Sequence, residues 1–179
     1  MASIGALVIT HDEAANIVDC LECLDFCDER VVVDSFSEDD TVVRAEALAD
    51  RIFHREFVDH AEQKNWGMSQ LDTDWILLID ADERVSSDLG RELESLAEDG
   101  DRDAYWLRRE NAFFGRWIRG AGWRRDRVLR FLRNGAGHYP AARLHEEIQV
   151  DEGRSVGECR HRLWHYSYDA WSPTFERLL

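Results

Sequence analysis

The chain has 179 residues, and its 37 acidic side chains outnumber the 22 Lys and Arg to give a formal net charge of −15. This length suits one domain with a sizeable core, and 44% hydrophobic residues are too many for a disordered acidic tail. The acidic balance excludes a general nucleic-acid-binding protein, which needs a basic surface. Lys64 is the single lysine beside 21 arginines, and such an acid-rich, lysine-poor surface is typical of adaptation to high salt.

Four predicted strands alternate with helices in residues 1–103. The apolar segments are 6–9, 30–34, 52–54 and 75–79, and the helical patterns are 13–24, 37–48, 62–71 and 89–96. We expect Ser37 to cap the second helix, and Ser86 or Ser87 to cap the fourth. Strands that are apolar throughout are buried on both faces, so the pattern predicts a mostly parallel sheet between helices.

Polar side chains follow three of these strands. They are Thr10, His11 and Glu13 after the first, Asp34 after the second, and Asp80 and Asp82 after the fourth. Ligands of open parallel sheets bind beyond the carboxyl ends of the strands. We therefore expect a binding site at this edge.

The second half, residues 104–179, has a different pattern of apolar and charged residues. Segments 105–109 and 127–133 alternate apolar with basic residues, which predicts half-exposed antiparallel strands around an aromatic and glycine-rich loop at 113–123. Nine arginines stand against Glu110 and Asp126 in residues 104–133. Two interpretations stay open: a local anion site, or arginines paired with acidic neighbours. We expect one α/β domain over residues 1–179 with a mixed second half.

The cysteines and the N-terminal segment indicate the cellular compartment in which we expect the protein. Cys20 and Cys23 have the spacing of a zinc-binding pair, but no second pair follows, so we favour buried thiols on one helix face, with Cys27, in a reducing cytoplasm. The apolar run at 4–10 is too short for a signal peptide or a membrane span.

The triplet Asp80-Ala81-Asp82 is the sharpest chemical signal. Two carboxylates at the end of a buried strand can hold Mg²⁺ or Mn²⁺, which would neutralise a diphosphate leaving group. Lys64 could meet a phosphate as a point charge. Among later residues, Glu146 could act as a general base and a neutral His165 as a metal ligand.

The sequence resembles the inverting glycosyltransferases of family 2, which have the GT-A fold, and within them the bacterial lipopolysaccharide-core β-1,4-glucosyltransferase-like group. The resembling segments run in family order through nearly the whole chain. They are residues 7–13, 31–41, 55–57, 63–65, 75–84, 114–119, 122–123, 144–146 and 165–167.

The resemblance implies a role for each matching residue. The nucleotide pocket would be lined by Thr10, Glu13, Asp34, Lys64, Asp80 and Ala81. Asp82, with Asp80 and His165, would hold Mn²⁺ or Mg²⁺ at the diphosphate of a donor that we expect to be a UDP-sugar. Glu146 would deprotonate the acceptor, a cell-surface glycan or glycolipid such as a lipopolysaccharide core, contacted by Trp117, Trp123 and Arg124.

Two features depart from the family pattern. The chain ends soon after residues 165–167, whereas members of the family usually continue with helices that help them meet the membrane. Either the sequence is a trimmed piece or its acceptor contacts differ, and we expect peripheral contact with the inner face of the cytoplasmic membrane. Glu147 follows Glu146 directly and competes for the role of base. The alternatives are a nucleotidyltransferase, which would carry a glycine-rich loop where residues 10–13 stand, and a non-catalytic nucleotide- or glycan-binding module.

Overall fold

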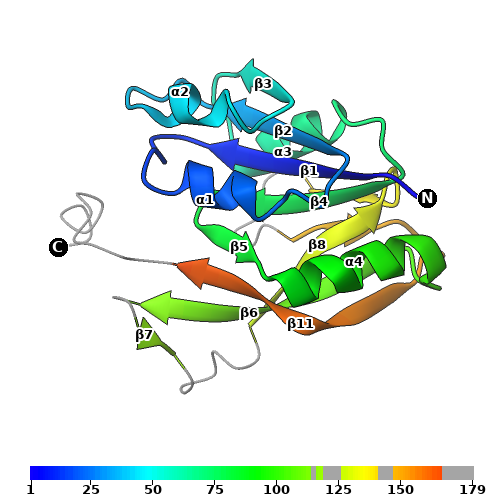
Figure 1. The fold of residues 1–179 in the computed structure, drawn as a ribbon. Coiled ribbons are helices and arrows are strands. Elements are labelled where there is room, and N and C mark those ends of the chain that lie inside the picture. The colour runs from blue at the N-terminus through cyan, green and yellow to red at the C-terminus, as the bar shows by residue number, and fades with distance from the viewer. Residues whose placement is uncertain (114–115, 119–125, 141–146, 167–179) are drawn as a thin grey trace, which may run out of the picture.

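A computed structural model describes residues 1–113, 116–118, 126–140 and 147–166 (Figure 1). Its helices are α1 (Ile17–Glu22), α2 (Thr41–Ala45), α3 (His60–Met68) and α4 (Ser87–Asp99). The first-half strands are β1 (Ile4–Thr10), β2 (Glu29–Asp34), β3 (Arg51–His54), β4 (Trp75–Asp80) and β5 (Glu83–Val85). The later strands are β6 (Ala104–Phe113), β7 (Arg116–Trp117), β8 (Arg127–Arg133), β9 (Gly137–His138), β10 (Gln149–Val150) and β11 (Val156–Tyr166).

The main sheet of the described chain has the strand order β3-β2-β1-β4-β8-β6-β11-β5, and β7 pairs with β6. Strands β1, β2, β3 and β4 are parallel to one another, as the apolar runs predict. Strand β8 is antiparallel to both β4 and β6, and β11 runs parallel to β6. The predicted mostly parallel sheet with a mixed second half is confirmed.

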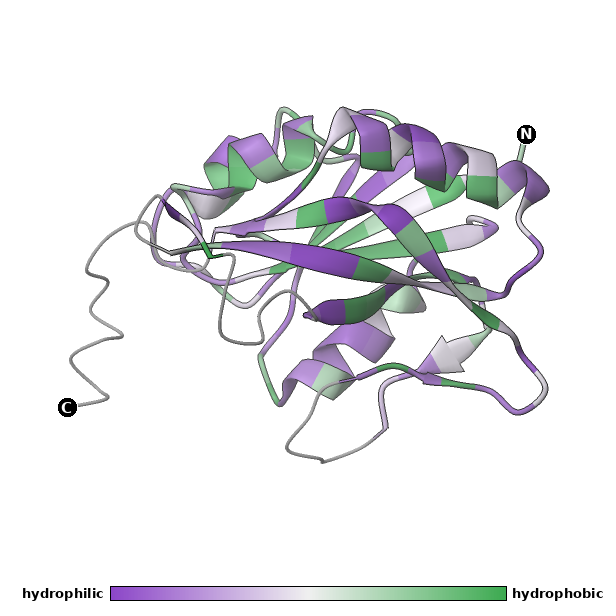
Figure 2. Cartoon of the chain, turned by 90° about the horizontal axis from the view of Figure 1, so that it is seen from below, coloured by the Kyte–Doolittle hydropathy of each residue, from purple (hydrophilic) through white to green (hydrophobic). Residues whose placement is uncertain are grey.

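Two apolar cores lie on opposite faces of this sheet. One contains buried side chains of α1 and α4, with Trp75 stacked on Phe131 at 4.6 Å between ring centroids. The other packs Met68 of α3 with Tyr139 and strand residues. Helices accordingly lie on both sides of the sheet, and the strands between them carry apolar segments (Figure 2). The continuous apolar strands are therefore buried on both faces, as expected.

Two predicted helices are wrong in extent. The first begins at Ile17 rather than residue 13, because residues 13–16 form a separate turn in which the Glu13 carbonyl accepts from the amides of Asn16 and Ile17. The second spans only Thr41–Ala45.

The predicted cap of the second helix is also wrong. The Ser37 hydroxyl donates to the Asp34 carboxylate and accepts from the Asp12 amide, so it connects the loop after β2 to the loop after β1. Ser86, in contrast, caps α4 as predicted, accepting from the Leu89 amide at 3.2 Å.

The sequence patterns do not predict β5 or the long strand β11. The register of β11 against β6 shifts between Glu158 and Arg162, which breaks its alternation. Glu92 of α4 compensates by accepting from the amides of Arg160 and His161 at 2.7 and 2.9 Å. These contacts attach α4 to the strand that carries His165.

Cys20, Cys27 and Cys159 are buried free thiols, and Cys23 is half-buried. Cys27 lies beyond the end of α1, so the cysteines do not share one helix face as predicted. Within the described ranges, no helix is long and apolar enough to cross a bilayer.

Candidate active site

The carboxyl ends of β1, β2 and β4 meet at one edge of the sheet. Thr10 is the register partner of Asp34, and Ile9 is the register partner of Asp80. The predicted grouping of these polar residues at one edge is therefore present. It follows from the parallel pairing of strands that all end at this level.

A cavity of about 370 Å³ opens at this edge. Its lining includes Thr10, Glu13, Lys64, Asp80, Ala81, Asp82 and His165 from the sequence-based set, together with Ile9, His11, Ser35, Phe57, His60 and Gln63. Thr10 Oγ1 and Gln63 Oε1 are buried and have no hydrogen-bond partner among the described residues. Because buried polar atoms are normally paired, a ligand with complementary groups would be held here.

Asp80 lies between two buried cations. Its carboxylate forms an ion pair with Arg130 and lies 3.7 Å from Lys64 Nζ. Burial alone would raise the pKa of Asp80, but the charges of Arg130 and Lys64 outweigh it and hold that pKa well below its usual range. Asp80 is therefore a carboxylate whose position is fixed by β8 and α3.

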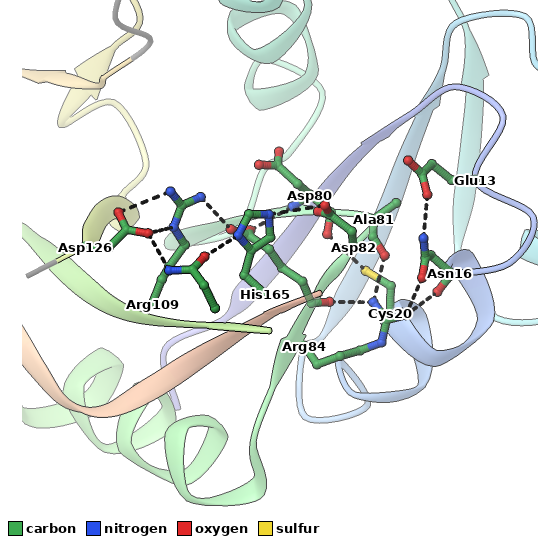
Figure 3. A network of polar contacts seen from close by, with 12 residues as sticks. Glu13, Asn16, Cys20, Asp80, Ala81, Asp82, Arg84, Arg109, Asp126 and His165 are labelled. Carbon is green, nitrogen blue, oxygen red and sulfur yellow. Dashed lines mark hydrogen bonds and ion pairs between the residues drawn. The ribbon is translucent and has the colours of Figure 1, made fainter. Parts of the chain in front are cut away.

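Asp82 and His165 both line the cavity and are in contact, with 3.2 Å between Asp82 Oδ2 and His165 Nε2 (Figure 3). Burial would lower the pKa of His165, but the hydrogen bond and charge of Asp82 raise it overall. A carboxylate oxygen and an imidazole nitrogen are both good ligands for Mn²⁺. This donor pair therefore offers two ligands for a divalent cation.

The predicted three-residue metal set is not assembled. Among the residues that the structure describes, no group of three His, Cys, Asp or Glu side chains could hold a metal ion. The physical reason is that Asp80 is held by Arg130 and Lys64, whereas Asp82 forms a close pair with His165.

Glu13 is held beside the cavity by Asn16, which donates to Glu13 Oε2 at 2.7 Å. Asn16 in turn accepts from Arg84 through its backbone oxygen at 2.9 Å (Figure 3). Burial raises the pKa of Glu13, and the charge of Asp82 adds to the rise. Glu13 is thus a positioned acceptor for a hydroxyl or amide donor.

Asp34 does not line the cavity. Its side chain is fully buried, accepts from the amide and hydroxyl of Ser37, and lies 3.2 Å from His54 Nδ1. In this arrangement Asp34 shapes the loop that carries Ser35, and Ser35 is the residue that reaches the cavity.

Of the residues expected at the acceptor, the structure describes Trp117 alone, since Trp123 and Arg124 lie outside the described residues, as does the expected base Glu146. Trp117 is 39% exposed and lies 6.1 Å from the Trp164 ring and 5.6 Å from the Tyr166 ring, between centroids. Trp164 and Tyr166 are the neighbours of His165 in β11, and the alternation of a strand turns their side chains to the opposite face from His165.

Residues 6–151 match the family model of glycosyl transferase family 2. The chain belongs to this family. A curated relative, the lipopolysaccharide core biosynthesis glycosyltransferase LpsC of Rhizobium meliloti, is 32% identical over 88% of this chain and 60% of its own length. The chain spans smaller shares of other glycosyltransferase relatives, such as 38% of one from Rickettsia felis.

Solved glycosyltransferases share this GT-A fold. TarS of S. aureus aligns over 92% of this chain and 60% of its own with a TM-score of 0.66 and 15% identity. Glucosyl-3-phosphoglycerate synthase of Mycobacterium tuberculosis, solved with Mn²⁺, UDP and glucosyl-3-phosphoglycerate, aligns over 62% of this chain and 44% of its own. Its TM-score is 0.51 and its identity 23%, so both likenesses concern the fold alone.

Part of the arginine-rich block of this family 2 chain is structural. Arg109 pairs with Asp126 and Glu83, Arg130 with Asp80, and Arg108 with Glu158. The acidic-neighbour interpretation therefore holds for these three arginines.

Sequence reasoning did not assign Glu83, Arg109, Asn111, Asp126 or Arg130 to the site. Their contacts connect β5, β6 and β8, strands that are distant along the chain. The available signal was Asp126, one of two acids within the basic segment 104–133.

Proposed function

We propose that this chain is the catalytic part of an inverting, metal-dependent glycosyltransferase. It moves a sugar from a nucleoside-diphosphate donor, UDP-linked in our proposal, to a glycan or glycolipid such as a lipopolysaccharide core. The observation that carries the proposal is the cavity that brings Asp82, His165 and Lys64 together at the carboxyl ends of the strands. The relatives named above support the donor class and the acceptor class.

The donor would bind with its nucleoside toward Thr10 and Glu13 and its diphosphate toward Lys64. Thr10 and Gln63 bring buried oxygens that need partners, which the base or ribose supplies. Asp82 and His165 would hold Mn²⁺ or Mg²⁺, which stabilises the negative charge that grows on the leaving diphosphate. Lys64 meets the same charge with its ammonium group.

Glu146 completes the proposed reaction as the general base. It takes the proton of the acceptor hydroxyl, whose oxygen bonds to the anomeric carbon while the bond from that carbon to the diphosphate oxygen breaks. Attack from the face opposite the leaving nucleotide inverts the anomeric configuration. Trp117 offers an exposed ring on which an acceptor sugar can stack.

Donor binding tests the first half of this proposal. Calorimetric titration of UDP-glucose with Mn²⁺ is expected to show binding that Asp82→Asn abolishes. The exposed Asp72 offers a matched control, and Asp72→Asn should bind the donor normally. If neither UDP nor any UDP-sugar binds the wild-type chain in a Mn²⁺-dependent way, the UDP donor site is refuted.

Turnover tests the second half, measured as UDP release with a lipopolysaccharide-core oligosaccharide. Glu146→Gln should bind the donor as the wild type does and lose turnover by roughly 10²–10⁴-fold. Glu147→Gln is the matched neighbour and should keep turnover. The opposite pattern in the two variants would move the base to Glu147.

A further inference from the structure

A chain of hydrogen bonds leads from β6 to the candidate metal pair. Arg109 donates to both carboxylate oxygens of Asp126, through Nε at 2.9 Å and through its terminal nitrogen at 3.2 Å. Asn111 Nδ2 donates to Asp126 Oδ2 at 2.8 Å. Asn111 Oδ1 lies 2.6 Å from His165 Nδ1. His165 Nε2 in turn faces Asp82 (Figure 3).

The chemistry of these groups fixes which atoms donate. The Asp126 carboxylate, ionised and paired with Arg109, can only accept, so the amide nitrogen of Asn111 must face it. The amide oxygen of Asn111 then faces His165, and an amide oxygen can only accept. His165 Nδ1 must therefore carry a proton.

Burial makes this arrangement costly to replace. Asn111 is 1% exposed and the His165 side chain is 17% exposed, so water cannot readily substitute for either partner. The bidentate pair with Arg109 keeps the Asp126 carboxylate from turning. Strand pairing adds to this rigidity, because Asn111 and His165 are register partners in β6 and β11.

We propose that Asn111, oriented by Asp126 and Arg109, is a positioning residue that keeps the proton of neutral His165 on Nδ1. The lone pair of Nε2 then points toward Asp82, and His165 and Asp82 can bind the same divalent cation. Without Asn111 the preference reverses, because Nε2–H could donate to the Asp82 carboxylate and close the site. The inference rests on the proposed metal role of Asp82 and His165, whereas the proton position can be tested without any metal.

The tautomer is read by long-range ¹H–¹⁵N NMR on metal-free protein with ¹⁵N-labelled histidine, at a pH where His165 is neutral. The wild type is expected to show Nδ1–H, and Asn111→Leu is expected to show Nε2–H. Asn111→Asp keeps an oxygen opposite His165 and should restore Nδ1–H. A merely structural role for Asn111 predicts instead that Asn111→Asp is as damaging as Asn111→Leu, because it places two carboxylates together.

Metal affinity supplies a second readout. Mn²⁺ titration in the presence of UDP, monitored by electron paramagnetic resonance, should show that Asn111→Leu lowers the Mn²⁺ affinity by about 10–100-fold. Asn111→Asp should stay close to the wild type. Asn134→Leu serves as a control for general destabilisation. It removes the hydrogen bonds that the Asn134 side chain donates to the carbonyl oxygens of Leu71 and Thr73, away from the cavity.

The outcomes separate the two proposals. Nε2–H in the wild type, or Nδ1–H with unchanged Mn²⁺ affinity in a folded Asn111→Leu variant, overturns the positioning role. If Asn111→Leu does not fold, the tautomer of His165 in Asn111→Asp is the test, and Nε2–H in that variant overturns the positioning role. If the tautomers behave as expected but the wild type binds no Mn²⁺, the metal site fails while the control of the tautomer by Asn111 stands.

Discussion

Arg130 on β8, whose side chain is buried, forms an ion pair with Asp80 at the end of β4, and its positive charge also acts on the buried carboxylate of Glu83. The two acids are close, since Glu83 Oε2 accepts from the Asp80 amide at 3.0 Å. The guanidinium of Arg130 therefore acts on two carboxylates, of which Asp80 lines the cavity.

Replacing Arg130 with Met is expected to lower the free energy of unfolding by about 3–5 kcal/mol, because it removes the ion-pair partner of Asp80 and a nearby positive charge from the buried Glu83. Urea unfolding at neutral pH measures the loss. Arg91→Met is the control, since the pair of Arg91 with Asp88 is exposed and worth at most about 1 kcal/mol. Adding Asp80→Asn to Arg130→Met should recover part of the loss. Equal effects of Arg130→Met and Arg91→Met would contradict the role.

Lys64 should act on the phosphates of the donor. Its Nζ lies 3.7 Å from Asp80 Oδ1 and 5.3 Å from the centre of the Tyr139 ring, which holds the ammonium at the cavity wall. We expect Lys64→Met to weaken UDP binding by about 10-fold, or 1.4 kcal/mol. Uridine, which has no phosphate, is the matched ligand and should lose little affinity in the same calorimetric titrations. An equal loss of affinity for UDP and uridine would mean that Lys64 supports the shape of the pocket and does not bind the phosphates.

The strands that build the site could be predicted because their signals are local. Continuous apolar runs end at Thr10, Asp34 and Asp80, and parallel pairing brings those ends together. Strand β11 could not be predicted, because its bulge interrupts the alternation. The pair of Arg130 with Asp80 depends on β8 lying antiparallel to β4, a long-range pairing with no local signature.

Gly67 tests how closely α3 must approach β1. A Cβ at position 67 would lie 2.7 and 2.8 Å from the two terminal carbons of Leu7, which is 1% exposed. Alanine usually favours a helix by up to about 1 kcal/mol over glycine, yet we expect Gly67→Ala to destabilise by about 1–3 kcal/mol through overpacking. Thermal unfolding measures the change. Gly90→Ala in α4 meets the half-buried Phe26 at 3.2 Å and should be nearly neutral, so stabilisation by Gly67→Ala would refute the close contact.

Glu92 gives a pH-dependent test of the attachment between α4 and β11. Burial would raise the pKa of Glu92, but the bonds from the amides of Arg160 and His161 outweigh it and lower that pKa below its ordinary value. His161 Nδ1 lies 2.8 Å from the same carboxylate and favours its charged form. The unfolded chain therefore takes up a proton at Glu92 more readily than the folded one. The stabilisation is fully present above the ordinary pKa of glutamate, about 4.3, and is lost as the pH falls through the folded value.

Glu92→Gln should accordingly lower the free energy of unfolding by about 1–2 kcal/mol at neutral pH, since an amide oxygen is a weaker acceptor and its nitrogen faces donors. The difference from the wild type should shrink as the pH falls below about 4. Urea unfolding of both proteins from neutral to acidic pH measures this, with the exposed Glu94→Gln as control. A difference that stays constant across that range would mean that the charge of Glu92 does not hold the bulge of β11.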